Sequence, residues 1–151
     1  MQSILEKYLL FHSNLTIWSK ENEMGPNARD SAKEWLQNAK NYYRSVGRKL
    51  ALAEFSDPNG MFTRGEMYIF VLDLKGIMLA HGIHSKHIGE DFLEVRDPDE
   101  KFFIKEIIES ANFDPSGWVE YKWLNPVTKE WMPKVTYWEL VDDVILCASG
   151  Y

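Results

Sequence analysis

The sequence predicts an α+β domain in which N-terminal helices pack on a five-stranded antiparallel sheet. Apolar side chains first recur at helical spacing. From Glu66 onward, short runs rich in Tyr, Trp, Ile and Val alternate with turns rich in Gly, Pro, Asn and Asp, and one helix-period segment interrupts them. With 151 residues, 45% of them hydrophobic, the chain can bury a substantial core. We expect residues 1–60 to form a helical region and residues 61–151 a sheet with one inserted helix, together making a single domain.

The N-terminal region is expected to hold two helices followed by a shorter helical segment. Apolar spacing predicts the first helix over residues 3–20, and Gly25 and Pro26 interrupt it because both resist helix continuation. A second helix follows, whose candidate N-caps are Asn27, Asp30 and Ser31. Its apolar face carries Trp35, Leu36, Ala39, Tyr42, Tyr43 and Val46. Gly47 either ends or kinks this helix, and residues 48–55 add one or two turns.

Five strands and one helix are expected after residue 66. In the first strand, alternation places Met67, Ile69 and Val71 on one face, and the opposite face carries Tyr68, Phe70 and Leu72. The pair Lys75-Gly76 predicts a hairpin into a second strand over residues 77–81. A helix is expected over residues 99–112, and a meander of three strands follows over residues 117–124, 131–140 and 144–149.

The charge and cysteine content argue against several function classes. The formal net charge of -6 disfavours nucleic acid or an anionic membrane as the main partner, because both demand a basic surface. The single cysteine, Cys147, excludes a disulfide framework within the chain, and its apolar run favours a small buried side chain over a reactive thiol. No stretch approaches the roughly 18 to 20 apolar residues that a membrane span needs.

Lys134 lies in a strand made mostly of aromatic and β-branched side chains, over residues 131–138. A cation on a pocket face would neutralise a carboxylate and donate up to three hydrogen bonds. A lysine on the outer face would simply be solvated, and the residues alone leave both interpretations open. Tyr137 is three positions away, so an ideal strand places the two side chains on opposite faces. At most one of them then points directly at a ligand, unless a bulge intervenes.

Two aromatic pairs share a face of their strands. Tyr121 and Trp123 are two positions apart, as are Tyr68 and Phe70. Each pair can wall a ligand pocket, with a phenol as hydrogen-bond donor, or can simply fill a core. The spacing does not separate these two interpretations.

Three histidines, His81, His84 and His87, follow one another at three-residue intervals. The intervening Gly82 and Ser85 indicate a loop, so the regular ligand spacing of a helix is not expected and a metal site is disfavoured. We expect His81, neutral or protonated, to donate a hydrogen bond to an anion instead.

The acidic residues do not form a convincing catalytic pair. Asp97, Asp99 and Glu100 stand at the start of the predicted helix, where the positive end of the helix dipole favours acidic groups. No Ser-His-Asp order, Gly-rich phosphate loop or Cys-His pairing is evident either. We therefore expect no catalytic residue, no cofactor and no enzymatic activity.

Several segments, taken in order, resemble the single Cache family of PAS-like sensor domains. Residues 66–81 are similar to the family's first hairpin, residues 87–89 to its liganding loop and residues 96–99 to the start of its central helix. The last three strands are matched by residues 117–126, 134–137 and 150–151, and the likeness extends upstream through residues 47–62. Roughly two thirds of the chain is covered.

The resemblance implies a PAS-like fold with a long N-terminal helix against a five-stranded antiparallel sheet. It implies a pocket over one face of that sheet, which in many relatives binds small carboxylates such as pyruvate, acetate or propionate. Relatives usually lie outside the inner membrane of bacteria, ahead of chemoreceptor or histidine-kinase modules. The match of Lys134 and Tyr137 to the family's Lys-x-x-Tyr pattern favours the pocket role for Lys134.

Three features depart from the family pattern. Gly82 stands where relatives often carry Pro, Gly25 and Pro26 break the N-terminal helix, and the sequence ends at Tyr151, where a membrane helix normally follows. We expect a periplasmic location if this is an excised receptor domain and a cytoplasmic one if the chain is complete.

The resulting hypothesis is a sensor domain for a small organic acid. Lys134 binds the carboxylate, and the expected ligand-binding set is Lys134, His81, Tyr121, Trp123, Tyr68, Phe70 and Tyr137. The alternative is a dimerisation module without a small ligand, which pairs two copies through the N-terminal helices. Four aromatic side chains that look exposed support it: Phe11, Trp18, Tyr42 and Tyr43.

Overall fold

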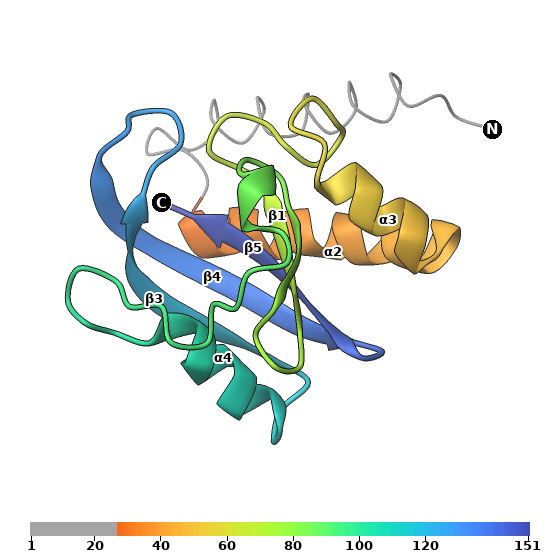
Figure 1. The fold of residues 1–151 in the computed structure, drawn as a ribbon. Helices are drawn as coiled ribbons and strands as arrows, with labels where there is room; N and C mark the ends of the chain where they lie inside the picture. Colours follow the sequence, from red (N-terminus) through yellow and green to blue (C-terminus); the bar gives the residue numbers. More distant parts are fainter. Residues whose placement is uncertain (1–26) are drawn as a thin grey trace.

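The computed structural model describes residues 27–151. Outside this range lie the helix predicted over residues 3–20, its break at Gly25 and Pro26, and the aromatic residues Phe11 and Trp18. Within it, the chain folds as α-helices packed on a five-stranded antiparallel sheet, which confirms the predicted α+β class (Figure 1).

Helix α2 (Ala28–Val46) begins and ends at residues that favour helix boundaries. Asn27 is its N-cap, and the side-chain oxygen accepts a hydrogen bond from the backbone N–H of Arg29 at 2.8 Å. Gly47 ends the helix with a φ of 89°, a backbone conformation that side-chain-bearing residues rarely adopt. Helix α3 (Arg48–Phe55) follows directly, so Gly47 separates two helices.

The sheet has the strand order β2-β1-β5-β4-β3, so the last strand in sequence occupies its centre. Its strands are β1 (Ile69–Asp73), β2 (Met78–His81), β3 (Ser116–Leu124), β4 (Trp131–Val141) and β5 (Val144–Gly150). The predicted hairpin joins β1 to β2. The Asp73 carboxylate accepts from the N–H groups of Lys75 and Ile77, and Gly76 adopts a φ of 96°.

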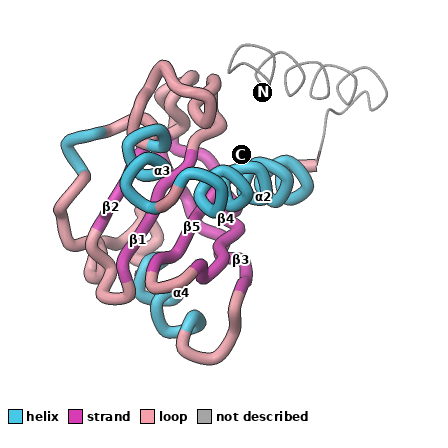
Figure 2. The backbone as a smooth tube through the Cα atoms, turned by 90° about the vertical axis from the view of Figure 1, so that its right-hand side faces the viewer, coloured by secondary structure: helices cyan, strands magenta, loops and turns pink. Residues whose placement is uncertain are grey.

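The two faces of the sheet are covered by different helices. Helices α2 and α3 pack on one face, and α4 (Phe103–Ala111) packs on the other (Figure 2). Alternation along β1 divides as predicted: Tyr68, Phe70 and Leu72 belong to the apolar cluster beneath α4, whereas Ile69 and Val71 belong to the cluster beneath α2.

Helix α4 begins at Phe103, four residues later than predicted, and the helix-dipole interpretation of the preceding acidic residues is wrong. The Asp97 carboxylate accepts from the backbone N–H groups of Asp99 and Lys101, which closes a tight turn. It also accepts from the N–H of Lys122 on β3 at 2.9 Å. Burial acts to raise the pKa of Asp97, but these backbone donors outweigh it and lower that pKa. Asp97 therefore fastens the loop to the sheet edge.

The premise of the dimerisation alternative is wrong for two of its aromatic side chains. Tyr43 is 4% exposed and belongs to the core beneath α2, while Tyr42 packs on Phe55 and Phe62. Both face inward because they extend the apolar stripe of α2. Phe11 and Trp18 lie outside the described residues, so dimerisation stays a prediction. Among the described residues, none of the helices is both long and apolar enough to cross a membrane.

Candidate functional site

Lys134 lies near the start of β4, on the face of the sheet that α4 covers, and its ammonium group is buried there. It pairs in register with Tyr121 of β3, and its side chain is only 3% exposed. The Nζ atom donates a hydrogen bond to the Tyr68 hydroxyl at 2.8 Å. Four aromatic rings surround the Nζ atom at 4.9 to 5.6 Å from their centroids: Tyr68, Phe70, Tyr121 and Tyr151.

This ammonium group has no anionic partner among residues 27–151. All ion pairs formed among these residues involve other cations. The Lys134 ammonium group therefore faces hydroxyl groups and aromatic rings rather than a carboxylate. Burial lowers the pKa of Lys134 from 10.5 to about 7. A buried cation without a carboxylate is costly, and cation–π contacts only partly offset that cost. The position therefore favours an anion that comes from outside these residues.

His81, at the end of β2, accepts backbone hydrogen bonds through its ring. Its Nδ1 atom accepts from the backbone N–H groups of Ile83 and His84, at 3.1 and 2.9 Å. The ring proton is consequently on Nε2. Burial lowers the pKa of His81 to about 2, and the nearby Lys134 adds to the effect. Of the two predicted charge states, the structure favours the neutral one.

Tyr121 is held by both a polar and an aromatic contact. Its hydroxyl bonds the Thr136 hydroxyl at 2.8 Å, which in turn bonds the Ser149 hydroxyl at 2.7 Å. Its ring stacks on Phe103 of α4 with centroids 4.1 Å apart. Trp123 meets the same Phe103 ring edge-on at 5.2 Å. The wall of the site therefore joins β3 to α4.

A small cavity of about 20 Å³ lies between these groups. It is lined by Tyr68, Phe70, Met78, His81, Phe92, Phe103, Ile104, Tyr121, Trp123 and Lys134. Six of the seven predicted site residues are thus brought together. The structure does not bring Tyr137 to them: it lies on the α2 face, where its ring packs on Trp118 at 4.7 Å. In a regular strand, side chains three positions apart point to opposite faces, and this separates Tyr137 from Lys134.

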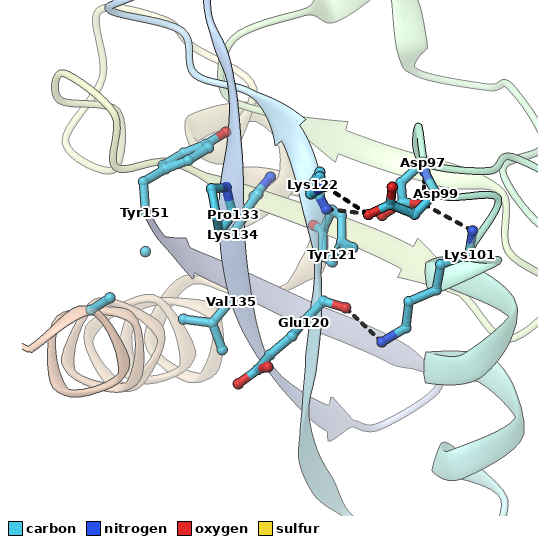
Figure 3. Close-up of a pocket in the computed structure, with 12 residues that line it drawn as sticks. Asp97, Asp99, Lys101, Glu120, Tyr121, Lys122, Pro133, Lys134, Val135 and Tyr151 are labelled. Carbon is cyan, nitrogen blue, oxygen red and sulfur yellow. Dashed lines mark hydrogen bonds and ion pairs between the residues drawn. The ribbon is translucent and has the colours of Figure 1, made fainter.

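A second, open pocket of about 470 Å³ adjoins the same lysine (Figure 3). It lies between the start of α2 and the β3–β4 edge, and it shares Tyr121 and Lys134 with the small cavity. Its other lining residues are Ala28, Asp97, Asp99, Lys101, Glu120, Lys122, Pro133, Val135, Gly150 and Tyr151. Lys122 is paired with Asp99 at 2.9 Å, so the charges of this pocket are largely compensated.

Sequence reasoning missed several residues of the site. Phe103 and Ile104 fall in the segment predicted as a helix, where helical spacing gives no sign of a ligand site, and Phe92 lies in a loop without periodicity. Tyr151 could have been found, because it continues the alternation of Cys147 and Ser149 on the α4 face.

The three histidines come together, but not as a metal site. The rings of His81, His84 and His87 lie 5.3 to 5.6 Å apart. Among residues 27–151, no group of three or more His, Cys, Asp or Glu side chains is arranged to hold a metal ion. One reason is that Nδ1 of His81 already accepts backbone hydrogen bonds.

Comparisons with known proteins relate the chain to one family and to several solved structures. The family model Single Cache domain 2 matches residues 29–144. No curated protein matches the chain.

Three solved structures share the fold. A methyl-accepting chemotaxis protein from Vibrio parahaemolyticus RIMD 2210633 is 18% identical, with a TM-score of 0.71 over 82% of this chain and 87% of that one. A periplasmic sensor domain of a chemotaxis protein is 20% identical, with a TM-score of 0.60 over 81% and 88%. A Cache chemosensory domain, described in terms of carboxylic acid recognition, is 20% identical, with a TM-score of 0.61 over 99% of both chains.

Proposed function

The chain belongs to the Single Cache domain 2 family, a family of sensory domains, and from that premise we propose that it senses a short carboxylate bound at Lys134. One observation carries the proposal. The Lys134 ammonium group is buried among aromatic rings, and no carboxylate of residues 27–151 pairs with it. A small organic acid supplies the missing negative charge, in a site whose walls keep water away. A similar domain described in terms of carboxylic acid recognition supports this assignment.

The donors around the cavity suit a carboxylate, which accepts hydrogen bonds through two oxygens. Lys134 supplies the charge and its N–H donors, and the Nε2 proton of neutral His81 supplies a further donor. Tyr68 and Tyr121 add hydroxyl groups. Phe70 and Trp123 wall the site with rings. These are binding roles, and none of them requires a catalytic residue.

The size of the cavity favours acids of a few carbon atoms, such as acetate, propionate or pyruvate. A volume of about 20 Å³ accommodates about one water molecule, so even acetate requires the walls of the cavity to move apart. A ligand shifts a conformational equilibrium only by binding one state better than the other. The expansion that accommodates the acid therefore supplies the conformational change that a sensor needs.

Strand β4 connects this site to helix α2. Its Lys134 lies on the α4 face, while Glu139, five residues later, lies on the α2 face and accepts a hydrogen bond from Lys40 at 2.7 Å. Gln37 of α2 donates to the same carboxylate. A movement of β4 on ligand binding is thereby transmitted to α2. We propose a shift of the N-terminal helical region against the sheet as the output.

Calorimetric titration with acetate, propionate and pyruvate tests the proposal, together with mass spectrometry of small acids that copurify with the protein. We expect at least one acid to bind with one-to-one stoichiometry. Lys134→Met should weaken it by at least about 30-fold, because it removes a buried charge-assisted contact. Lys75→Met, which removes a charge from the hairpin turn, is the matched control and should bind normally. Failure of all three acids to bind, with no acid copurifying, would refute the proposal.

A further inference from the structure

The four rings around Lys134 differ in how they are held. Tyr68, Phe70 and Tyr121 are buried within or next to strands. Tyr121 is also fixed by its hydroxyl bond and by its stack on Phe103. Tyr151 is only partly buried and follows the last paired residue of β5. Of the four rings, Tyr151 is therefore the one least enclosed by the sheet.

Tyr151 also stands on the side of Lys134 that adjoins the open pocket. It lines that pocket but not the small cavity, and its ring centroid lies 5.6 Å from the Lys134 Nζ atom. Figure 3 shows it beside Lys134 and Pro133, at the end of β5. Its hydroxyl donates to the Leu124 carbonyl oxygen at 3.2 Å. That bond ties the ring to the end of β3, and a second hydrogen bond joins the Tyr151 and Tyr68 hydroxyls.

The backbone before Tyr151 restricts how the ring can move. Gly150 packs against the first turn of α2, and a Cβ atom there would lie 2.5 Å from the Ala28 carbonyl oxygen. The main chain at this point is therefore confined. Rotation of the partly exposed Tyr151 side chain, which breaks its hydroxyl contacts with Leu124 and Tyr68, remains the economical way to uncover Lys134, because side chains change rotamer faster than backbone segments rearrange.

We infer that the open pocket is the access route to Lys134 and that Tyr151 controls passage along it. The ligand is the small carboxylate of the proposed function, and in this respect the inference rests on that function. The carboxylate collects in the open pocket and passes Tyr151 to reach the ammonium group. The competing route leads through the loop between β2 and α4, where Phe92 lines the small cavity. The two routes are distinguishable because Tyr151 borders the first and Phe92 the second.

The test measures how fast a small reagent reaches Lys134, and it needs no ligand. The protein is methylated with ¹³C-formaldehyde and dimethylamine–borane at pH 8, and the labelling of each lysine is followed by peptide mass spectrometry. Tyr151→Ala should raise the labelling rate of Lys134 by about tenfold or more. Tyr151→Phe keeps the ring but loses the hydroxyl contacts with Leu124 and Tyr68, and should raise the labelling rate by about threefold. Lys101 and Lys122, which line the open pocket, should be labelled at unchanged rates and thereby report an intact fold.

Phe92→Ala is the matched control, and it should change the labelling rate of Lys134 by less than about twofold. An increase with Phe92→Ala that equals or exceeds the increase with Tyr151→Ala would overturn the inference. So would an unchanged rate in Tyr151→Ala. Repeating the labelling with propionate, acetate or pyruvate separates the two proposals. Protection of Lys134 by an acid supports the proposed function, whereas its failure to protect leaves the dependence on Tyr151 measurable.

Discussion

The two faces of the sheet are both covered by helices, yet they bury different chemistry. The face beneath α2 is packed with apolar side chains, and its ion pair between Lys40 and Glu139 lies at the margin of the cluster. The face beneath α4 buries a histidine, a chain of hydroxyls and a lysine that has no carboxylate partner among residues 27–151. Apolar burial explains the first face through stability alone. The second face buries polar groups that cost stability, and for this reason we propose it as the ligand-binding face.

Truncating the core beneath α2 should have the largest effect on stability and leave the α4 face intact. Leu36 is fully buried there, and Leu36→Ala should lower the free energy of unfolding by about 2 to 5 kcal/mol. Acid affinity, measured by calorimetry under conditions where the variant remains folded, should stay within about threefold of wild type. Denaturant unfolding measures the stability. A loss of affinity comparable to that of Lys134→Met would show that the two faces are not separable.

On the α4 face, removing the buried charge through Lys134→Met should instead increase stability. Lys134 has a folded-state pKa of about 7, below its ordinary value of 10.5, so the buried charge destabilises the fold fully below pH 7. As pH rises above 7 the folded protein loses this proton before the unfolded chain does, and wild-type stability recovers. Lys134→Met should therefore be more stable than wild type at pH 6. Its advantage should shrink by up to about 1.4 kcal/mol per pH unit between pH 7 and 9.

Denaturant unfolding of both proteins at pH 6, 7, 8 and 9 checks this expectation. Lys75→Met should show a stability difference from wild type that does not vary over the same range. A constant difference for Lys134→Met as well would mean that the lysine keeps its ordinary pKa, and hence that an anionic group outside residues 27–151 pairs with it.

The smallest effect comes from deleting one hydroxyl on each face. Tyr121→Phe removes a buried member of the hydroxyl chain and should cost about 1 to 2 kcal/mol of unfolding free energy. It should also weaken acid binding severalfold. Tyr137→Phe makes the same chemical change on the α2 face and should leave acid affinity unchanged. An equal loss of affinity in the two variants would contradict the assignment of the site to the α4 face.

Local signals in the sequence predicted the framework well. Asn27 and Gly47 bound α2, the Asp73–Gly76 turn joins β1 to β2, and three further strands appear at the predicted places. The prediction failed at residues 97–101, where composition suggested a helix start. Asp97 instead bonds to the backbone of β3, a partner 25 residues away that no local pattern reveals.

For the site, the sequence by itself determined which residues share a face. Side chains alternate along every strand, so Lys134 and Tyr137 had to part, while Tyr121 had to lie with Trp123. Only the tertiary structure decided that Lys134 is buried rather than solvated. Its burial depends on the Tyr68 ring, 66 residues earlier in the chain, and on Tyr151 after β5. The strand order brings both rings to the Lys134 Nζ atom. Alternation is local geometry, whereas a lysine's environment is the sum of distant contacts.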